Sequence, residues 1–579
     1  MSLYANPNGN ANPNGNAPAE PQVPKASQAC MSCRKQKRKC SKTLPACGLC
    51  ERMNRHCDYS DASPPPTSED FMALQRQVSK LESILKGEGG VMNQPSPYQT
   101  SASGLASSDG LPQAPVYTPL QDIPWQGLQN RFPVIAFLDN GSFKSGGINV
   151  PRPSVEIPVD ALEMLGNGDS VSVTINEYFS TVHKWLPIVS EKRLTRNMQN
   201  PMWEGGPDLA LLFLCMKLIT SKPQDGLDCA HNPIYLSAKR FVGLMEATGT
   251  ASLLVLQANL LVTWYEYSQA VYPAAWMSAG WCLRYGNMLG INGHEEAAQL
   301  LGPLNTWTER EERRRTWWGV LLTDRIVSLG SQGHIMNSQE PTAGDFLPAD
   351  DTAWENGELQ AMEKKVSNPL EDPVAPFPRL CQAFVQLGKV LKHNHVSKPA
   401  DPHEPQKPRF IEASILYSEI SLLARTLLVE ANNSKDFLAF AAPLALTYSA
   451  LCTLCESYSC PKGCKADTAE EQAMQAQAID GLKWVSLSIM EFSDRITKES
   501  PMPHDLDRVS PIIMDALYSA ACNYAWLFRE NGDAASQAAL ESIRLSLRRL
   551  QTRWRNAAEY LRILEAQEFV GFAGRNRGS

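Results

Sequence analysis

Six cysteines between Cys30 and Cys57 limit what this part of the chain can fold into more than any other feature does. Their spacing is C-x2-C-x6-C-x6-C-x2-C-x6-C, so two halves of equal length each open with a cysteine pair and close with a third cysteine. A segment this short cannot bury enough apolar surface to fold unaided. We therefore expect a covalent or metal staple.

A metal staple is favoured over disulfides, which need an oxidising compartment. Residues 1–24 lack the charged start and apolar run of a secretory signal. No apolar stretch is long enough to predict a membrane helix; Leu253–Val262 comes nearest, but Gln257 and Asn259 interrupt it. In a reducing compartment thiolates bind Zn²⁺. Six thiolates complete two four-ligand tetrahedral sites only if two of them bridge both ions.

The charge of the chain is unevenly distributed. Residues 25–57 contain nine Lys or Arg and one Glu, a net charge of +8, whereas the whole chain carries −7 and the remainder therefore −15. A small basic head on an acidic body is expected when only the head meets phosphate groups. This pattern argues against a protein that coats nucleic acid or membrane surfaces along its whole length.

The cysteine stretch resembles the fungal Zn2Cys6 binuclear-cluster DNA-binding domain, and Pro45 stands in the loop where that family usually has a proline. The resemblance implies a cofactor of two Zn²⁺ bridged by the first and fourth cysteines. One ion would then be held by Cys30, Cys33, Cys40 and Cys47, and the other by Cys47, Cys50, Cys57 and Cys30. The chain departs from the family at three positions that touch no metal ligand, namely Gln36, Arg38 and Ser41.

The basic residues that follow Cys33 are the predicted contacts with double-stranded DNA. We expect a short helix to begin within Met31–Lys39. The resemblance implies that Lys37 reads guanine in a CGG-like half-site, while most of its neighbours contact phosphates. The predicted DNA-binding residues are Arg34, Lys35, Lys37, Arg38 and Lys39.

We expect five segments along the chain. They are a disordered tail rich in Asn, Pro and Gly (1–24), the DNA-binding domain (25–60), a linker with a short coiled coil (61–90), a flexible linker (91–128) and a helical regulatory domain (129–579). The coiled coil would join two copies of the chain through apolar residues spaced three and four apart: Phe71, Leu74, Val78, Leu81 and Leu85. The alternative is a short helix packed on the body.

The fold class predicted for the whole chain is mainly α, with a small metal module and a large all-α body. The apolar pattern predicts helices from about residue 170, two of them within 253–291 and a single last helix over 540–564, with an extended crossing over 349–408. The stretch from Glu311 to Arg325, followed by Asp345-Phe-Leu-Pro348, resembles the fungal-specific transcription factor domain, a largely helical body.

Two clusters within this body have alternative interpretations. The run Arg313-Arg314-Arg315 could be a second phosphate site, but pairing with Asp324 or helix ends is favoured because the body is acidic. The second cysteine group could hold Zn²⁺, but two of its members lie on an apolar stretch where buried free thiols are common. This group comprises Cys452, Cys455, Cys460 and Cys464.

The sequence contains no G-x-S-x-G, HExxH, Walker or GxGxxG motif in a fitting context, so we expect no enzyme. The combined features predict a nuclear, zinc-dependent transcription factor of RNA polymerase II genes, working with the transcription machinery or co-activators and a small-molecule effector. The resemblance suggests an activator of a metabolic or secondary-metabolite gene cluster. The alternative is a co-regulator or repressor acting through protein contacts of the helical body.

Overall fold

The structure is a computed structural model. It describes residues 24–26, 28–59, 132–148, 150, 155–199, 205–293, 300–302, 304, 306–330, 338–358, 363–396, 410–459 and 468–575. The chain divides into two compact units, Met1–Tyr117 and Thr118–Ser579. The predicted coiled coil and the linker over 91–128 lie outside the described residues, so both stay predictions.

The described part of the first unit is a small module built on two short helices, α1 (Met31–Lys35) and α2 (Gly48–Arg52). Each helix begins directly after a cysteine that serves as its N-cap residue, Cys30 or Cys47. The predicted first helix is therefore present, but it ends at Lys35 because Lys37 adopts a positive φ of 50°.

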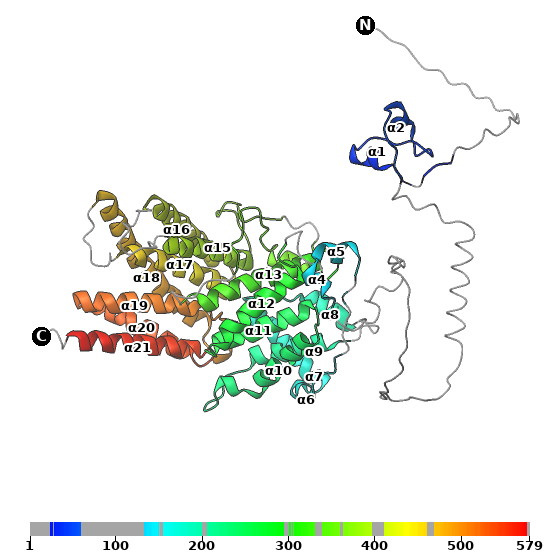
Figure 1. The fold of residues 1–579 in the computed structure, drawn as a ribbon. Helices are drawn as coiled ribbons and strands as arrows, with labels where there is room; N and C mark the ends of the chain where they lie inside the picture. The colour runs from blue at the N-terminus through cyan, green and yellow to red at the C-terminus, as the bar shows by residue number, and fades with distance from the viewer. Residues whose placement is uncertain are drawn as a thin grey trace, which may run out of the picture. The chain divides into compact units, whose positions relative to one another are not determined.

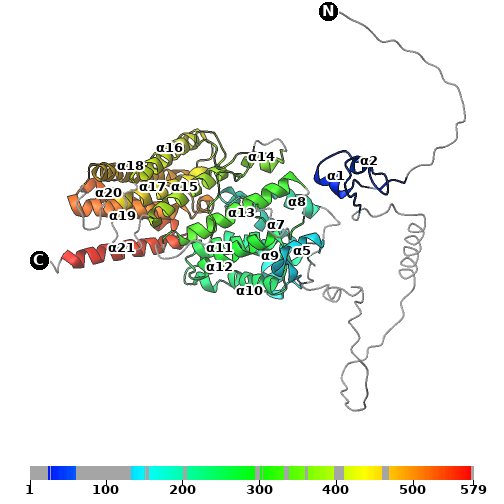
Figure 2. The same cartoon turned by 45° about the horizontal axis from the view of Figure 1, so that its top comes forward.

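The second unit is a helical body, shown from two directions in Figures 1 and 2. Its first part contains α4 (Ile135–Leu138), α5 (Asn140–Ser145), α6 (Val159–Leu165), α7 (Gly168–Ser180), α8 (Glu191–Gln199), α9 (Pro207–Thr220), α10 (Pro233–Ala247), α11 (Leu253–Ser268), α12 (Ala274–Leu289) and α13 (Trp307–Ser328). Its second part contains α14 (Asp351–Asn356), α15 (Pro376–Val396), α16 (Phe410–Asn433), α17 (Ala441–Ser459), α18 (Ala469–Glu499), α19 (Ile513–Asn531), α20 (Ala534–Leu550) and α21 (Asn556–Arg575). The 3-10 turns are η2 (Val182–Lys184), η3 (Cys229–His231), η4 (Leu438–Phe440) and η5 (Pro503–Arg508).

Helix α11 is the centre of the first part of the body. It is apolar on nearly all sides and packs against α9, α10, α12 and α13. Ser252 starts it, since its hydroxyl accepts a hydrogen bond from the backbone N–H of Leu254. A helix that is hydrophobic all round needs neighbours on every side, and this explains why α11 is buried along nearly its whole length, whereas α12 keeps exposed positions such as Met277.

Helix α17 is the centre of the second part, where it packs against α15, α16, α18 and α19. Within the described part of the chain, Leu438–Ser459 is long and apolar enough to cross a membrane, and 89 % of its most apolar window is buried inside the body. The expectation that Leu253–Val262 comes nearest to a membrane span is therefore wrong. The burial is that of a core helix.

The mainly α fold class is confirmed, but two elements differ from the predictions. The segment 349–408 is not simply extended, since most of its described residues belong to two helices, α14 and α15. The single last helix is wrong as well, because α20 ends at Leu550 and α21 begins at Asn556. The apolar spacing continues across this break, which hides it from a periodicity argument.

The break between α20 and α21 joins the two parts of the body. Trp554 is fully buried there and meets Trp185 edge to face, with ring centroids 6.4 Å apart. The neighbouring Arg553 is buried too; its guanidinium pairs with Asp507 and donates a hydrogen bond of 2.7 Å to the carbonyl of Ile219. The segment between α20 and α21 thus contacts Trp185 and Ile219 of the first part of the body.

The arginine run of α13 pairs with carboxylates. Arg313 contacts Glu309 at 2.7 Å, Arg314 contacts Glu311 at 3.2 Å, and Arg315 contacts Glu311 at 3.0 Å. Arg315 is fully buried and also reaches Asp351 at 2.7 Å, while its guanidinium lies 4.3 Å from the ring centroid of Trp354. The arginines are therefore paired, but with Glu309, Glu311 and Asp351 rather than with the expected Asp324, which accepts a hydrogen bond from the backbone N–H of Ser338.

Candidate metal centre

The small module is built on an internal repeat. Cys30 and Cys47 are 17 residues apart and each caps a five-residue helix. The backbone hydrogen bonds repeat as well: the N–H of Arg38 donates to the carbonyl of Cys33 at 3.0 Å, and the N–H of Arg55 donates to that of Cys50 at 2.9 Å. The two halves of the cysteine motif therefore fold in the same way locally.

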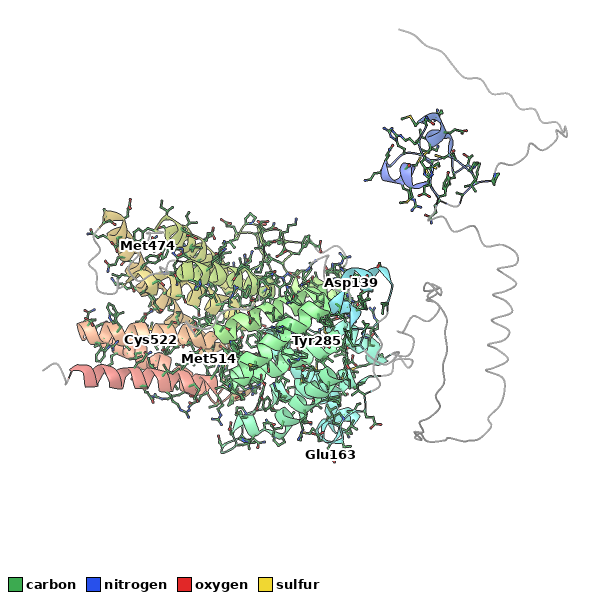
Figure 3. The ribbon with its side chains drawn as sticks, in the orientation of Figure 1. Asp139, Glu163, Tyr285, Met474, Met514 and Cys522 are labelled. Atoms are coloured by element: carbon green, nitrogen blue, oxygen red, sulfur yellow. The ribbon has the colours of Figure 1, made fainter. Side chains whose placement is uncertain are left out.

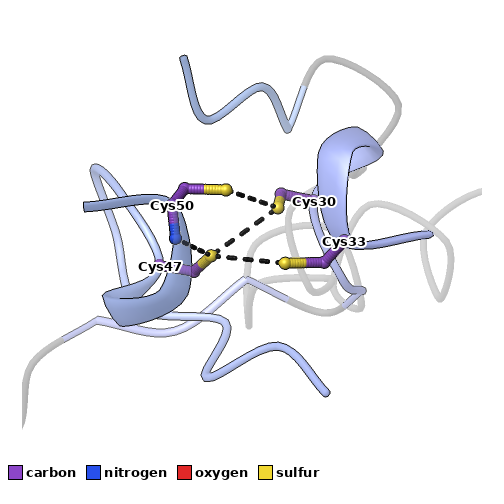
Figure 4. A group of neighbouring side chains, drawn as sticks. All are labelled: Cys30, Cys33, Cys47 and Cys50. Carbon is purple, nitrogen blue, oxygen red and sulfur yellow. Dashed lines mark hydrogen bonds between the residues drawn. The ribbon is translucent and has the colours of Figure 1, made fainter. Parts of the chain in front are cut away.

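Four buried thiols meet where the two halves face one another. The sulfurs of Cys30, Cys33, Cys47 and Cys50 all lie within 4.8 Å of one another (Figure 4). Cys30 Sγ lies 3.7 Å from Cys47 Sγ and 3.6 Å from Cys50 Sγ, and Cys33 Sγ lies 3.6 Å from Cys47 Sγ. Neighbouring sulfurs of a tetrahedral site with Zn–S bonds of about 2.3 Å stand about 3.8 Å apart. The thiols are thus already at the spacing that Zn²⁺ requires.

The third cysteine of each half completes the donor set at the edge of this group. Cys40 Sγ lies 4.0 Å from Cys30 Sγ, and Cys57 Sγ accepts a hydrogen bond of 3.2 Å from the backbone N–H of Cys47. Both residues are half-buried, whereas the other four cysteines are buried. The structure therefore brings together all six cysteines that the spacing singled out, with Cys30 and Cys47 in the middle.

The backbone prepares one of the central thiols for metal binding. Burial opposes ionisation of Cys47, but the backbone N–H of Cys50, which donates to its sulfur at 3.4 Å, and the neighbouring thiols outweigh it and lower the pKa of Cys47 to about 6. The thiolate is the form that binds metal. The residues present therefore fit a zinc cluster in their chemistry as well as in their spacing.

The two residues that follow the last cysteine, Asp58 and Tyr59, pack onto the module and lie inside the range 25–60 that the sequence predicts for it. The carbonyl of Asp58 accepts a hydrogen bond of 2.9 Å from the N–H of Met31, and Tyr59 Oη donates to the carbonyl of Thr43 at 3.2 Å. Tyr59 Oη also lies 3.8 Å from Cys40 Sγ. Both residues therefore belong to the module, and Tyr59 contacts it through its aromatic hydroxyl.

The predicted DNA-binding residues follow the first cysteine pair and reach beyond α1. Arg34, Lys37, Arg38 and Lys39 are exposed, and the side chain of Lys35 is outside the described set. Arg34 Nε donates to the carbonyl of Ala29 at 2.9 Å, which leaves its two terminal nitrogens available. A dense group of exposed cations beside a small rigid centre is the electrostatic footprint of a nucleic-acid interface.

The second predicted cysteine group is only partly described. Cys452 and Cys455 lie on α17 and are fully buried, and burial raises the pKa of Cys455 to about 12. Cys460 and Cys464 lie outside the described residues. Buried thiols kept protonated by an apolar environment behave as small hydrophobic side chains.

Comparison with known proteins identifies both parts of the chain. Residues 28–66 match the fungal Zn(2)-Cys(6) binuclear cluster domain, and residues 175–381 match the fungal specific transcription factor domain. Transcription factor BOA15 of Botryotinia fuckeliana (strain B05.10) is 36 % identical over 181 residues, which cover 31 % of this chain and 97 % of that protein. The chain belongs to the fungal Zn2Cys6 transcription factors. It is accordingly a DNA-binding regulator of transcription, and its N-terminal module is a binuclear zinc cluster.

Two further relatives align over more of this Zn2Cys6 factor. The pigment biosynthesis transcriptional activator pigB of Monascus ruber is 24 % identical over 416 residues, covering 68 % of this chain and 72 % of the relative. The citrinin biosynthesis transcriptional activator mrl3 of Monascus ruber is 23 % identical over 401 residues, covering 65 % of this chain and 74 % of the relative. Fungal transcription factors of this kind act in the nucleus, and their families imply a role other than catalysis.

Proposed function

We propose that this protein is a nuclear activator of a secondary-metabolite gene cluster, which it reaches by binding CGG-like half-sites. The relatives pigB and mrl3 carry names that assign them to the activation of pigment and citrinin biosynthesis. The observation that carries the proposal is the group of zinc-spaced thiols with exposed cations beside it.

In the proposed mechanism, the six cysteines would hold two Zn²⁺ and the folded head would read DNA. Cys30 and Cys47 would serve both ions, which their central position among the thiols supports. Cys33 and Cys40 would complete one site, and Cys50 and Cys57 the other. When bound, the zinc supplies the charge and the rigid connection that hold these thiolates together.

Within this head, Lys37 contacts the base edges while Arg34, Lys35, Arg38 and Lys39 position the module on phosphates. The exposure of the described side chains supports their contact with DNA, and the left-handed backbone of Lys37, just after α1, sets this residue apart from its neighbours. Phosphate contacts fix orientation, whereas base contacts determine sequence preference.

We further propose that two copies of the chain act together on DNA. The spacing of the apolar residues in the seam defined by Phe71, Leu74, Val78, Leu81 and Leu85 supports a two-stranded coiled coil. A dimer brings two heads to paired half-sites. The helical body would then present a surface to co-activators of RNA polymerase II transcription.

The test uses the full-length protein loaded with zinc and short duplexes that carry CGG or a scrambled triplet. We expect tighter binding to the CGG duplex and a steep loss of affinity as salt is raised. The Cys33→Ser variant should lose zinc and DNA binding together. Binding without sequence preference would contradict the proposal and favour a co-regulator that acts through protein contacts of its body.

A further inference from the structure

A hydrogen bond connects the two halves of the zinc module outside the thiol centre. Arg55 Nη1 donates to the side-chain oxygen of Gln36 at 2.6 Å, although the two residues are 19 positions apart. Gln36 is the C-cap residue of α1, and Arg55 follows α2. The guanidinium of Arg55 is therefore held at the C-terminal end of the other half's helix.

Because Gln36 is uncharged, the guanidinium of Arg55 can lie against a segment that already contains five cations. In the run from Arg34 to Lys39 every residue except Gln36 is Lys or Arg. A cation brought against any of the others would meet a like charge, which costs free energy at this density. The amide oxygen of Gln36 is uncharged and accepts a hydrogen bond, so it gives Arg55 a favourable contact inside a strongly positive segment.

The contact is specific to one half of the internal repeat. Arg38 and Arg55 occupy equivalent positions, and their backbone N–H groups make equivalent hydrogen bonds to Cys33 and Cys50. Arg55 nevertheless uses its side chain to reach across the module. Its Nη1 group contacts Gln36, and the remaining guanidinium donors are available to a second partner, since the residue is exposed.

We propose that Arg55 is a further phosphate contact of the DNA-binding face and that Gln36 is its positioning residue. This inference rests on the proposed function, because it concerns the same face of the module. A guanidinium presents a planar fork that matches phosphate oxygens. Holding that fork on Gln36, within the basic segment, before DNA arrives reduces the side-chain entropy that binding would otherwise remove.

The experiment measures the affinity of the zinc-loaded full-length protein for the CGG duplex over a range of salt. We expect Arg55→Gln to weaken binding roughly threefold to tenfold and to lower the slope of log K against log salt by about 0.9 per chain. Arg52→Gln is the matched control, since Arg52 is exposed in the same half but its Nε donates to the carbonyl of Gly48 in its own helix rather than to the basic segment of the other half. We expect Arg52→Gln to change the slope of log K against log salt by less than half as much as Arg55→Gln does.

The role of Gln36 is tested by a double-mutant cycle, with two bound zinc ions per chain confirmed for each variant. Gln36→Ala should weaken binding, and Gln36→Ala combined with Arg55→Gln should bind no more weakly than Arg55→Gln alone. Additive losses would overturn the positioning role, and an unchanged salt slope in Arg55→Gln would overturn the phosphate contact. If the unmodified protein itself fails to prefer the CGG duplex, the proposed function fails instead.

Discussion

Lys37 and Asn54 adopt the same left-handed backbone conformation, with φ of 50° and 48°, at equivalent positions of the 17-residue repeat. Each residue ends its turn by donating its backbone N–H to a carbonyl three positions earlier, on Arg34 or Glu51. The repeat thus extends from the cysteines to the backbone that connects them. The module is two copies of one turn, with thiols between them.

The left-handed turn gives a test of the module's stability. Asn tolerates a positive φ, whereas a β-branched residue is strained there by about 1–2 kcal/mol. We expect Asn54→Val to release zinc to a competing chelator at lower chelator concentration, while Asn54→Gly retains zinc at least as well as the natural residue. Met53→Val is the control, because Met53 is exposed and has a φ of −94°. Equal zinc retention by the two valine variants would contradict the prediction.

The central position of Cys47 predicts how many zinc ions the module loses when this cysteine is replaced. Its sulfur contacts those of Cys30 and Cys33 in the first half and belongs to the same group as that of Cys50 in the second, so we expect that replacing it removes a donor from both sites. We expect Cys47→Ser to bind no zinc rather than one ion per chain, as measured by elemental analysis of the purified protein.

The control for this loss is Cys522→Ser in the helical body, where Cys522 lies half-buried on α19 (Figure 3). That variant should keep two zinc ions per chain. One ion retained by Cys47→Ser would show that Cys47 belongs to a single site.

The seam at the break between α20 and α21 predicts a strong effect of one tryptophan. Trp554 is fully buried, and its indole N–H donates to the carbonyl of Val509 at 2.9 Å. Removing such a side chain typically costs about 3–5 kcal/mol. We expect Trp554→Ala to lower the thermal midpoint of the body strongly, as followed by circular dichroism, whereas Trp526→Ala on α19 should change it little because Trp526 is 49 % exposed. Similar midpoints for both variants would contradict the assignment of the seam.

His183 predicts a pH dependence of stability. The residue is buried against Phe179 and Trp354, and burial, followed by the charges of Lys184 and Arg315, lowers its pKa to about 3. An unfolded chain binds that proton near pH 6.5. Because the unfolded state then binds more protons than the folded state, His183 reduces stability as pH falls below about 6.5, by about 2 kcal/mol between pH 7 and pH 5.

This contribution is measured from urea unfolding of the body at several pH values. His183→Gln should be less stable at pH 7 but should lose less stability than the natural protein on going to pH 5. His231→Gln is the control, since the His231 side chain is 74 % exposed. If His183→Gln loses as much stability as the natural protein between these pH values, His183 is not the group responsible.

The zinc module could be predicted in detail because its chemistry is local in sequence. The spacing of six cysteines fixes which thiols can share a metal ion, and the structure brings together the same six. The contact between Gln36 and Arg55 could not be predicted, since it depends on how the two halves face one another. Sequence spacing contains no information on that orientation.

In the helical body, prediction from the sequence had a different limit. The buried helix α11 was predictable from its apolar pattern, although Gln257 and Asn259 interrupt it. Helix α15 was missed because prolines and charges precede and follow it, although its own residues from Phe377 to Val390 include many that are buried. The break before α21 was missed because Trp554 keeps the apolar spacing while its neighbour Arg553 is held by the distant carbonyl of Ile219.

The hydrogen bond from Arg553 to Ile219 joins residues that are 334 positions apart. At about 5–20 residues per second, a ribosome needs roughly twenty seconds to a minute to synthesise the intervening chain. During that time α9 and Trp185 have already been synthesised, but Arg553 and Trp554, which contact them in the folded body, have not. The newly made first part of the body therefore exposes an unfinished apolar surface, and a molecular chaperone that shields it should raise the yield of active regulator.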